Sequence, residues 1–318
     1  MPQVSVIIPT YNRPAELTNC IQSILTQSEK PDEVIIIDDG ALPAPPLKKE
    51  CTERGIYYLY IKEEKPGLAE SRNVGAKVAQ GDIIFYFDDD VILSSEYIEE
   101  VLKVYEEDQE KSFGGVEGVM SNITPLSAFQ HFRKISHMIF LTVGLKEGKV
   151  LPSGFVTDFG TQGVPLEKVQ EVDFFHGYAM SFRKKIFQEF SFDEKKYQRY
   201  GLGEDQDFSY RVSKKYKLIV TPRARVWHLE SEKMRPDQER IGMNLMIHRF
   251  LFFRDQVKKG WWSWVLFWYA LIGFVLLRVI PIPLSLDKRK LRRAKGILKG
   301  IKNILLGKAK GYQDRLFL

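Results

Sequence analysis

The sequence predicts an α/β protein with a doubly wound, mostly parallel β-sheet, followed by a helical C-terminal region. Short apolar β runs alternate with helical stripes over roughly the first 90 residues, which is the pattern of successive βα units. The chain has 318 residues, of which 44% are hydrophobic, so it is long enough to bury a large core. An uncharged apolar run and a basic tail then mark off the C-terminal part.

Each element of the first third has its own signal. Apolar, isoleucine-rich runs predict strands, and apolar side chains that recur every three or four residues predict helices. A Pro-rich loop at 42–46 separates the second strand from a short helix. On these signals the strands are expected at 3–8, 33–38, 56–60 and 83–87, and the two longer helices at 14–27 and 68–79.

The pattern weakens beyond residue 120 and then sharpens again. Residues 121–170 contain several Gly and Pro and are expected to form a variable wall of the site. Further on, the sequence predicts a strand at 174–183, a helix at 206–214 that Gly203-Glu204-Asp205 opens, and an extended segment at 218–228. We therefore expect one domain over residues 1–235 and a separate helical region over 236–318.

Polar and acidic residues follow three predicted strands where each strand ends. The first strand ends in Pro9-Thr10-Tyr11-Asn12, the second in Asp38-Asp39-Gly40, and the fourth leads into Asp88-Asp89-Asp90. Ligands of doubly wound sheets bind beyond the carboxyl ends of the strands. Three adjacent carboxylates repel one another unless a cation is present, and oxygen ligands favour Mg²⁺ or Mn²⁺ over zinc. The alternative is a solvated acidic turn.

The net charge of +6 does not indicate a nucleic-acid-binding protein. Ten Lys or Arg and no acid lie in residues 288–310, so the rest of the chain has 37 basic and 41 acidic residues, a balance of −4. No basic face with interleaved aromatic residues is visible, and we expect no nucleic-acid partner. Cys20 and Cys51 lack metal-ligand spacing and are expected to be reduced thiols.

Four segments carry a resemblance to a known family. They are VSVIIPTYNRP, IIIDDG, GLAESRNVGAKVAQGDIIFYFDDDV and GLGEDQDFSYR, in this order and spacing. Together they resemble the inverting family 2 glycosyltransferases, which have a Rossmann-like GT-A fold, and the resemblance covers roughly residues 3–230. It implies a nucleotide-sugar donor, a metal held by a DxD motif and one carboxylate base. Residues 1–120 would bind the nucleotide sugar and residues 121–235 the acceptor.

The resemblance also implies roles for individual residues on the donor side. Asp39 would face the nucleoside base, Asp90 would ligate the metal directly, and His228 matches a histidine that closes the metal shell in several GT-A enzymes. For His228 a purely structural role is the alternative, and for Tyr11 it is ordinary turn packing. The positions implied at the nucleotide sugar are Pro9, Tyr11, Asp38, Asp39, Arg72, Asn73, Asp88 and Asp89, and those implied at the metal are Asp88, Asp90 and His228.

Glu204 and Asp205 match the family's "ED" pair, with Asp205 at the position of the general base. Inversion needs a carboxylate opposite the leaving nucleotide to take the proton of the acceptor hydroxyl, and an unperturbed Asp is ionised at neutral pH. The alternative is that these acids only favour the helix macrodipole. His176 and Gly177, together with Glu204, are expected on the acceptor side.

The function that follows is metal-dependent, inverting glycosyl transfer in cell-surface glycan or glycolipid synthesis. A UDP-sugar is favoured as the donor, and the acceptor would be a glycan or a lipid-linked hydroxyl. One alternative is a haloacid-dehalogenase-like phosphatase, although the nucleophile strand of such enzymes comes first in their domain. Another is a non-catalytic membrane protein that binds nucleotide sugars.

The C-terminal region has two signals for membrane association. Residues 261–277 are uncharged and contain four tryptophans, which suits a helix that lies in the membrane plane or re-enters it and breaks at Pro281 and Pro283. A full span is the alternative. Beyond it, apolar residues at 291, 294, 298, 301 and 305 among basic ones predict an amphipathic helix on anionic lipid, or else one packed on the acidic surface of the catalytic domain.

The location expected is the cytoplasmic face of the cell membrane, with anchoring through the C-terminal region. No basic segment followed by a long apolar run is visible at the N-terminus, so no secretory signal is expected.

Overall fold

The chain forms two compact units in a computed structural model that describes residues 2–64, 67–122, 128–161, 165–198, 202–229, 237–279 and 287–310. Unit 1 comprises residues 1–125, 160–200 and 204–234, and unit 2 comprises residues 126–159, 201–203 and 235–318. Residues 126–159, which were expected at a wall of the site, thus group with the C-terminal helices. Their aromatic side chains contact that region, as between Phe140 and Tyr269.

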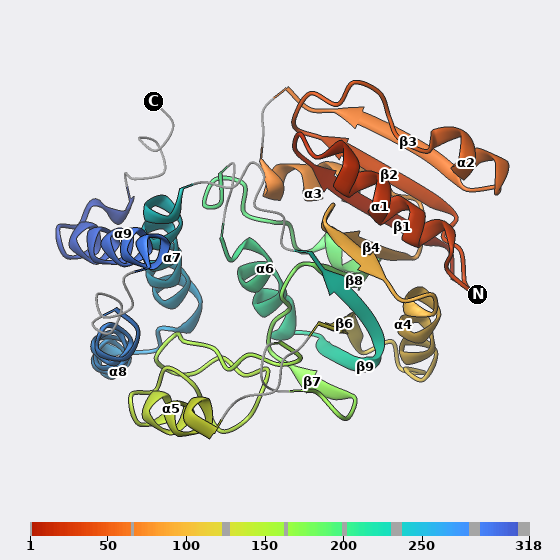
Figure 1. The fold of residues 1–318 in the computed structure, drawn as a ribbon. Coiled ribbons are helices and arrows are strands. Elements are labelled where there is room, and N and C mark those ends of the chain that lie inside the picture. Colours follow the sequence, from red (N-terminus) through yellow and green to blue (C-terminus); the bar gives the residue numbers. More distant parts are fainter. Residues whose placement is uncertain are drawn as a thin grey trace. The chain divides into compact units, whose positions relative to one another are not determined.

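Unit 1 is built on one sheet whose described strands follow the order β3-β2-β1-β4-β8-β6-β9-β5, with β7 paired to β9 (Figure 1). The strands β3, β2, β1 and β4 are parallel, and β8 is antiparallel to both β4 and β6. Their bounds are β1 Val4–Thr10, β2 Glu33–Asp38, β3 Tyr57–Lys62, β4 Ile83–Phe87, β5 Val91–Leu93, β6 Phe113–Met120, β7 Gln170–Val172, β8 Ala179–Arg183 and β9 Lys217–His228.

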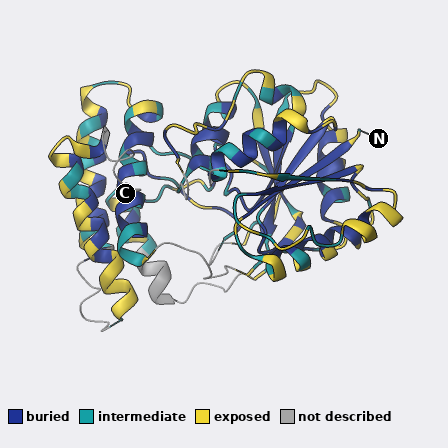
Figure 2. Cartoon of the chain, turned by 90° about the horizontal axis from the view of Figure 1, so that it is seen from above, coloured by how far each residue is buried: buried dark blue, intermediate teal, exposed yellow. Residues whose placement is uncertain are grey.

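Helices cover both faces of this sheet, so its central strands β1, β2 and β4 are buried on both sides. On one face, α1 and α4 pack on Val6, Ile8 and Phe85. On the other face, α3 approaches Ile7 so closely that a Cβ at Gly75 would lie 2.5 Å from it. Figure 2 shows the central strands in the colour of buried residues. The helices of unit 1 are α1 Pro14–Leu25, α2 Lys48–Glu53, α3 Leu68–Val78, α4 Tyr97–Glu106, α6 Glu204–Ser213 and the 3-10 helix η1 Lys184–Gln188.

The predicted α/β sheet is confirmed, but it is mixed and not mostly parallel, because β8 is antiparallel to both of its neighbours and β5 and β7 are antiparallel to β9. One predicted strand is also corrected. The predicted strands 33–38 and 83–87 match β2 and β4 to the residue. The predicted strand 174–183 is wrong in its first half, because only β8, Ala179–Arg183, is extended. Gly177 has φ +86°, in the left-handed region, and this residue turns the chain just before β8. The elements between residues 91 and 120 were not predicted.

Unit 2 contains mainly helices that pack through aromatic and small residues. Phe253 stacks on Phe267 with ring centroids 4.5 Å apart, which joins the end of α7 to α8. Among the described residues, no helix is both long enough and apolar enough to cross a bilayer. The prolines expected to break the apolar helix lie outside the described residues. The bounds are α5 Ala128–Ile139, α7 Gln238–Phe252, α8 Trp261–Phe274, α9 Lys288–Leu305, the π-helical turns η2 Phe253–Val257 and η3 Val275–Val279, and the 3-10 turn η5 Lys308–Lys310.

Within unit 2, the basic helix α9 packs on α7. Ala294, Ile297 and Ile304 are buried, whereas Leu298 is 50% exposed. Two lysines of α9, Lys295 and Lys299, pair with Glu239 of α7. The apolar stripe that was expected to face lipid is therefore divided between α7 and solvent.

Candidate active site

The candidate site lies at one edge of the unit 1 sheet, where β1, β2, β4 and β9 end and β8 begins. Because β4, β6 and β9 run in the same direction and β8 runs against them, the turn before β8 reaches the same edge as the ends of β4 and β9. This places Asp88, Gly177 and His228 close together.

The three adjacent aspartates point to different partners. Asp88 accepts a hydrogen bond from Arg72 Nη2 at 3.3 Å, and its side chain is 30% exposed. Asp89 turns back into the protein, where Thr10 Oγ1 and Arg13 Nη1 donate to its two oxygens at 2.8 and 2.9 Å. Burial raises the pKa of Asp89 to about 6, although Arg13 counters this shift. The contacts of Asp89 thus join the ends of β1 and β4 within the protein.

Asp90 and His228 complete a set of groups that fits a divalent cation. One ligand atom each from Asp88, Asp90 and His228 lie within 4.8 Å of one another. Asp90 Oδ1 is 3.0 Å from His228 Nε2, across the antiparallel pairing of β5 with β9. Two carboxylates and one imidazole suit Mn²⁺, while Mg²⁺ accepts a nitrogen ligand less readily. The residues present therefore fit a divalent cation, as the sequence predicted.

Arg72 is a buried link between the metal-binding side and the acidic pair. Its guanidinium donates to Glu204 Oε1 at 2.9 Å, to the Gly177 carbonyl at 3.1 Å and to Asp88. Charge-assisted hydrogen bonds from a planar guanidinium fix the relative positions of the groups that accept them. Arg72 was predicted to border the nucleotide. In the structure its buried side chain contacts Asp88, and a contact with the nucleotide stays a prediction.

Asp205 lies in the first turn of α6 against the backbone of Gly177. A Cβ on Gly177 would lie 2.5 Å from Asp205 Oδ2, so only glycine fits here. Burial and the neighbouring Glu204 raise the pKa of Asp205 well above its ordinary value, although Arg72 counters the shift. The unperturbed pKa assumed from sequence is therefore corrected, and Asp205 has the higher basicity that suits a proton acceptor.

The residues expected at the nucleoside divide into anchored and exposed groups. Asp38 is fully buried and accepts hydrogen bonds from Tyr60, Lys62 and two backbone amides. Asp39 accepts from Ser71 Oγ and the Gly67 amide, which links β2 to the start of α3. Burial raises the pKa of Asp39. Tyr11 is 39% exposed, while Pro9 lies inside β1.

Asn73 makes contacts that were not expected from the sequence. Its side-chain amide donates to the Phe192 carbonyl and to Glu194, and it accepts from the Phe192 amide. These bonds hold the segment after η1 against α3. A contact between Asn73 and the nucleotide stays a prediction.

Two residues of this edge were missed from the sequence. Arg13 links Asp89 to Asp90, and Glu117 on β6 accepts hydrogen bonds from the amides of His176 and Gly177. For Glu117 a signal was present, because a lone acid in the apolar, glycine-rich run FGGVEGVM has to find buried partners. No feature of the sequence around Arg13 indicated its contacts with Asp89 and Asp90.

Comparison with known proteins agrees with this fold. Two solved structures, both 14% identical, are S. aureus TarS 1–349 (TM-score 0.57, covering 97% of this chain and 82% of that one) and mannosyltransferase PcManGT from Pyrobaculum calidifontis in complex with GDP-Man and Mn²⁺ (TM-score 0.55, 96% and 88%). These structures show the fold alone, which is that of GT-A glycosyltransferases. The sequence profile of glycosyl transferase family 2 matches residues 5–190. The chain belongs to this family.

Curated relatives match over shorter stretches. Glycosyltransferase GlyA of Streptococcus pneumoniae is 33% identical over 102 residues, 32% of this chain and 15% of its own. An uncharacterized glycosyltransferase of Haemophilus influenzae is 35% identical over 114 residues, 35% of this chain and 37% of its own. The chain therefore matches well under half of the length of these relatives.

Proposed function

We propose that this chain transfers a sugar from a nucleoside-diphosphate donor to a hydroxyl acceptor with inversion at the anomeric carbon, with Asp205 as the general base. One observation carries the proposal, namely that Arg72 and Gly177 hold Asp205 and Glu204 next to Asp88. A proton acceptor and a diphosphate-binding group must flank the same anomeric carbon in a single displacement, and this arrangement provides both.

The residues divide the work by their positions. Asp205 accepts the proton as the acceptor oxygen bonds to the anomeric carbon, while the bond from that carbon to the diphosphate breaks. Arg72 keeps Glu204 and Asp88 in place throughout, and its positive charge lies beside both. Asp88, Asp90 and His228 would hold a divalent cation. When bound, such a cation supplies positive charge for the departing diphosphate.

The donor and the acceptor are proposed by chemical class. Solved neighbours include TarS in complex with UDP-GlcNAc and PcManGT with GDP-Man. We favour a UDP-sugar, with Mn²⁺ ahead of Mg²⁺, and a glycan or lipid-linked hydroxyl acceptor in cell-surface glycan synthesis. Family membership disfavours the phosphatase alternative. A chain that only binds nucleotide sugars is distinguished by its lack of turnover.

The test is donor turnover by the purified chain, with and without Mn²⁺. UDP- and GDP-sugars are supplied, and release of the nucleoside diphosphate is measured. We expect turnover that a chelator abolishes and that Asp90→Asn lowers at least about tenfold. Glu171→Gln, at an exposed position on β7, is the control and should leave turnover unchanged. Full activity in excess chelator would refute the metal assignment.

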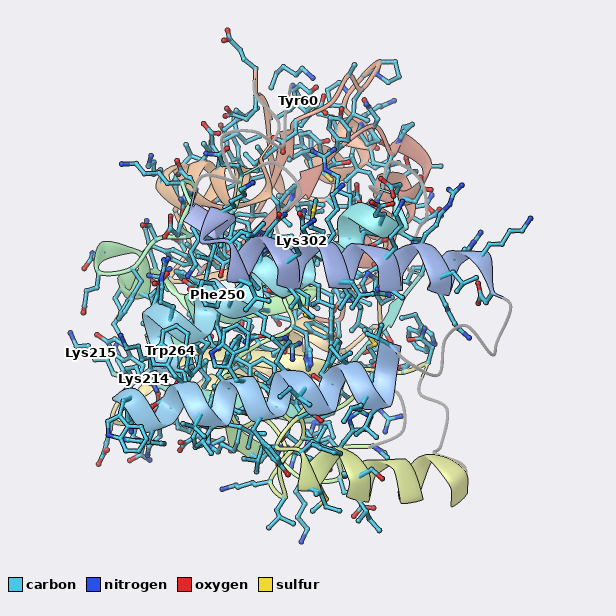
Figure 3. All side chains as sticks on the ribbon, turned by 90° about the vertical axis from the view of Figure 1, so that its left-hand side faces the viewer. Tyr60, Lys214, Lys215, Phe250, Trp264 and Lys302 are labelled. Atoms are coloured by element: carbon cyan, nitrogen blue, oxygen red, sulfur yellow. The ribbon has the colours of Figure 1, made fainter. Side chains whose placement is uncertain are left out.

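We further propose that unit 2 rests on an anionic membrane surface through the exposed apolar side of α8. Five large side chains recur every three or four residues along α8 and the π-helical turn η3 that follows it, and they are between 40% and 58% exposed: Trp262, Val265, Tyr269, Ile272 and Leu276. The opposite side of α8 packs on α7, where Trp264 contacts Phe250 (Figure 3). Tyr269 also donates to the Ile139 carbonyl, so α5 extends the same apolar surface.

Charge favours lipid as the occupant of this surface. The helix α8 has no charged residue, while Lys258 and Lys259 precede it and α9 presents exposed lysines and arginines. Figure 3 shows α9, with Lys302, on the same side of unit 2 as α8. Apolar side chains flanked by basic residues are suited to the headgroup region of anionic lipid, where tryptophan and tyrosine also concentrate. The location that follows is the cytoplasmic face of the cell membrane.

Vesicle sedimentation tests this surface with matched variants. Val265→Ser/Ile272→Ser should lower binding to phosphatidylserine-containing vesicles at least about tenfold, because each lost apolar side chain removes roughly 1.5–3 kcal/mol of burial. Tyr57→Ser/Val78→Ser, at exposed apolar positions of unit 1, should leave binding unchanged. Equal binding by both variants and the wild type would refute the proposal, as would a second copy of the chain that covers α8 in solution.

A further inference from the structure

Glu117 is a carboxylate with no exposed surface, and it lies in the middle of the sheet next to the candidate site. It is on β6, where its neighbours across the sheet are Met180 of β8 and Val220 of β9. Burying an acid is costly unless hydrogen bonds replace its water, and burial raises the pKa of Glu117. A residue that serves only the core would not need this charge.

The partners of Glu117 all belong to the turn that precedes β8. The His176 amide donates to both carboxylate oxygens at 3.1 Å, and the Gly177 amide donates to Oε1 at 3.2 Å. His176 Nδ1 lies 3.6 Å from Oε2. The carboxylate thus holds two consecutive backbone amides at the point where Gly177 takes its left-handed conformation.

This turn contacts both halves of the reaction machinery. The Gly177 carbonyl accepts from Arg72, which also holds Asp88 and Glu204. The Gly177 Cα faces Asp205 without room for a methyl group. Because interiors are close-packed, a shift of the turn by a fraction of an ångström moves its neighbours as well. Errors of about 1 Å in a catalytic group cost roughly a hundredfold in rate.

We infer that Glu117 is a positioning residue for the transfer reaction, because its carboxylate fixes the His176–Gly177 turn and, through this turn, the places of Asp205 and Arg72. The inference rests on the proposed glycosyl transfer. It adds a residue that touches neither donor nor acceptor, and it assigns His176 and Gly177 a task in aligning the base.

The test compares Glu117→Gln with Glu33→Gln. The amide keeps the shape of Glu117 but presents an N–H group to amides that need an acceptor. We expect kcat for donor turnover to fall at least about tenfold while the donor Kd stays within about twofold, since the contacts of Asp39 do not involve Glu117. Glu33 is a matched control, because it is also a buried acid that accepts from a hydroxyl and a backbone amide, at the opposite end of the sheet.

Hydrogen exchange gives a second readout that needs no substrate. Residues 174–178 should exchange faster in Glu117→Gln than in the wild type, and Glu33→Gln should leave them unchanged. If Glu117→Gln does not fold, Glu117→Asp keeps the charge, retracts it by one methylene and should change kcat and exchange in the same directions.

The outcomes separate this inference from the proposed function. A folded Glu117 variant with wild-type kcat overturns the inference, and so does an equal loss of kcat in Glu33→Gln. Unchanged exchange at 174–178 also overturns it. A wild-type chain that turns over no nucleotide sugar would instead refute the proposed function, while the exchange measurement would still decide whether Glu117 holds the turn.

Discussion

Asp205 combines two demands that oppose each other. Burial beside Glu204 raises its pKa, which favours the protonated form in the folded chain. A general base has to be deprotonated before it can act. Activity that depends on Asp205 should therefore increase with pH through its raised pKa, whereas the stability that its protonated form contributes is present at low pH and is lost over the same interval.

We predict that Asp205→Asn removes both effects. The variant should bind the donor normally and lose transfer by roughly a hundredfold or more, and its residual rate should no longer increase along the acidic limb of the pH profile. At neutral pH its thermal midpoint should be at least that of the wild type, because no carboxylate has to be ionised in a buried position. Calorimetry, pH-rate profiles and thermal unfolding measure the three outcomes. A retained acidic limb would show that another group is the base.

A second prediction concerns Gly177. Alanine there combines a strained left-handed backbone with a methyl group that would lie 2.5 Å from Asp205, so transfer should fall at least about tenfold. Gly55→Ala is the control for backbone strain alone, because Gly55 has φ +79° and open space around it. It should lose stability but not activity. Similar losses of activity in both variants would mean that strain, and not contact with the base, is responsible.

Side-chain roles at this edge were only partly predictable from the sequence. Resemblance pointed to the acidic positions, but three consecutive aspartates look alike until the fold shows that Asp89 turns toward Arg13 while Asp90 meets His228. The histidine is separated from Asp90 by well over a hundred residues, so only the pairing of β5 with β9 brings them together. Glu117 was missed because the rest of its strand has the pattern of ordinary core, although the lone acid in that run was itself a signal.

Elements were predictable where an apolar run has sharp polar ends. The strands β2 and β4 end at acidic residues, which fixed their last positions. The segment before β8 was not predictable in this way, because the apolar residues at 174–178 fit a strand and only the backbone of Gly177 breaks it. The pairing of α7 with α9 was not predictable either, because it depends on how their side chains pack and the sequence pattern of each helix does not identify its partner.

The contact between α7 and α9 depends on glycines. A Cβ at Gly296 would lie 1.8 Å from the Glu239 carbonyl oxygen, and one at Gly242 would lie 2.2 Å from that of Arg293. The two backbones therefore approach each other as closely as small residues allow.

We predict that Gly296→Ala pushes these helices apart. Overpacking of this kind typically costs about 1–3 kcal/mol, which should exceed the small gain in helix propensity. Arg292→Ala, at an exposed position of the same helix, is the control and should change stability by less than about 0.5 kcal/mol. Denaturant unfolding provides the comparison. Equal stability of the two variants would mean that the helices do not pack in this way.

At the scale of the whole molecule, the chain order does not match the spatial units. Unit 2 takes residues 126–159 from the middle of the sequence and 235–318 from its end, while most of the residues between them, 160–200 and 204–234, return to unit 1. The sequence predicted a boundary near 235 because composition changes there. It could not predict that the earlier segment joins the C-terminal helices, since that depends on contacts such as Phe155 with Phe274.

This organisation leads to a prediction about truncation. Removing all residues after Lys259 deletes α8 and α9, which exposes the aromatic side chains of Phe140, Phe155 and Phe253 that α8 covers. We expect the shortened chain to bind a hydrophobic dye and to aggregate at concentrations where the full chain stays monodisperse. Light scattering and dye fluorescence measure this. A monodisperse truncated chain without dye binding would show that the remaining part of unit 2 covers these rings itself.

The interleaved order of the two units also has a consequence for biosynthesis. Residues 126–159 leave the ribosome about 100 residues before α8 does. At roughly 5–20 residues per second, their apolar side chains are therefore not covered by α8 for about 5–20 s after synthesis. During this interval the sheet of unit 1 is also incomplete, because β9 is still being made. Rare codons placed between residues 160 and 260 would lengthen this interval, and we expect them to increase aggregation of the newly made chain.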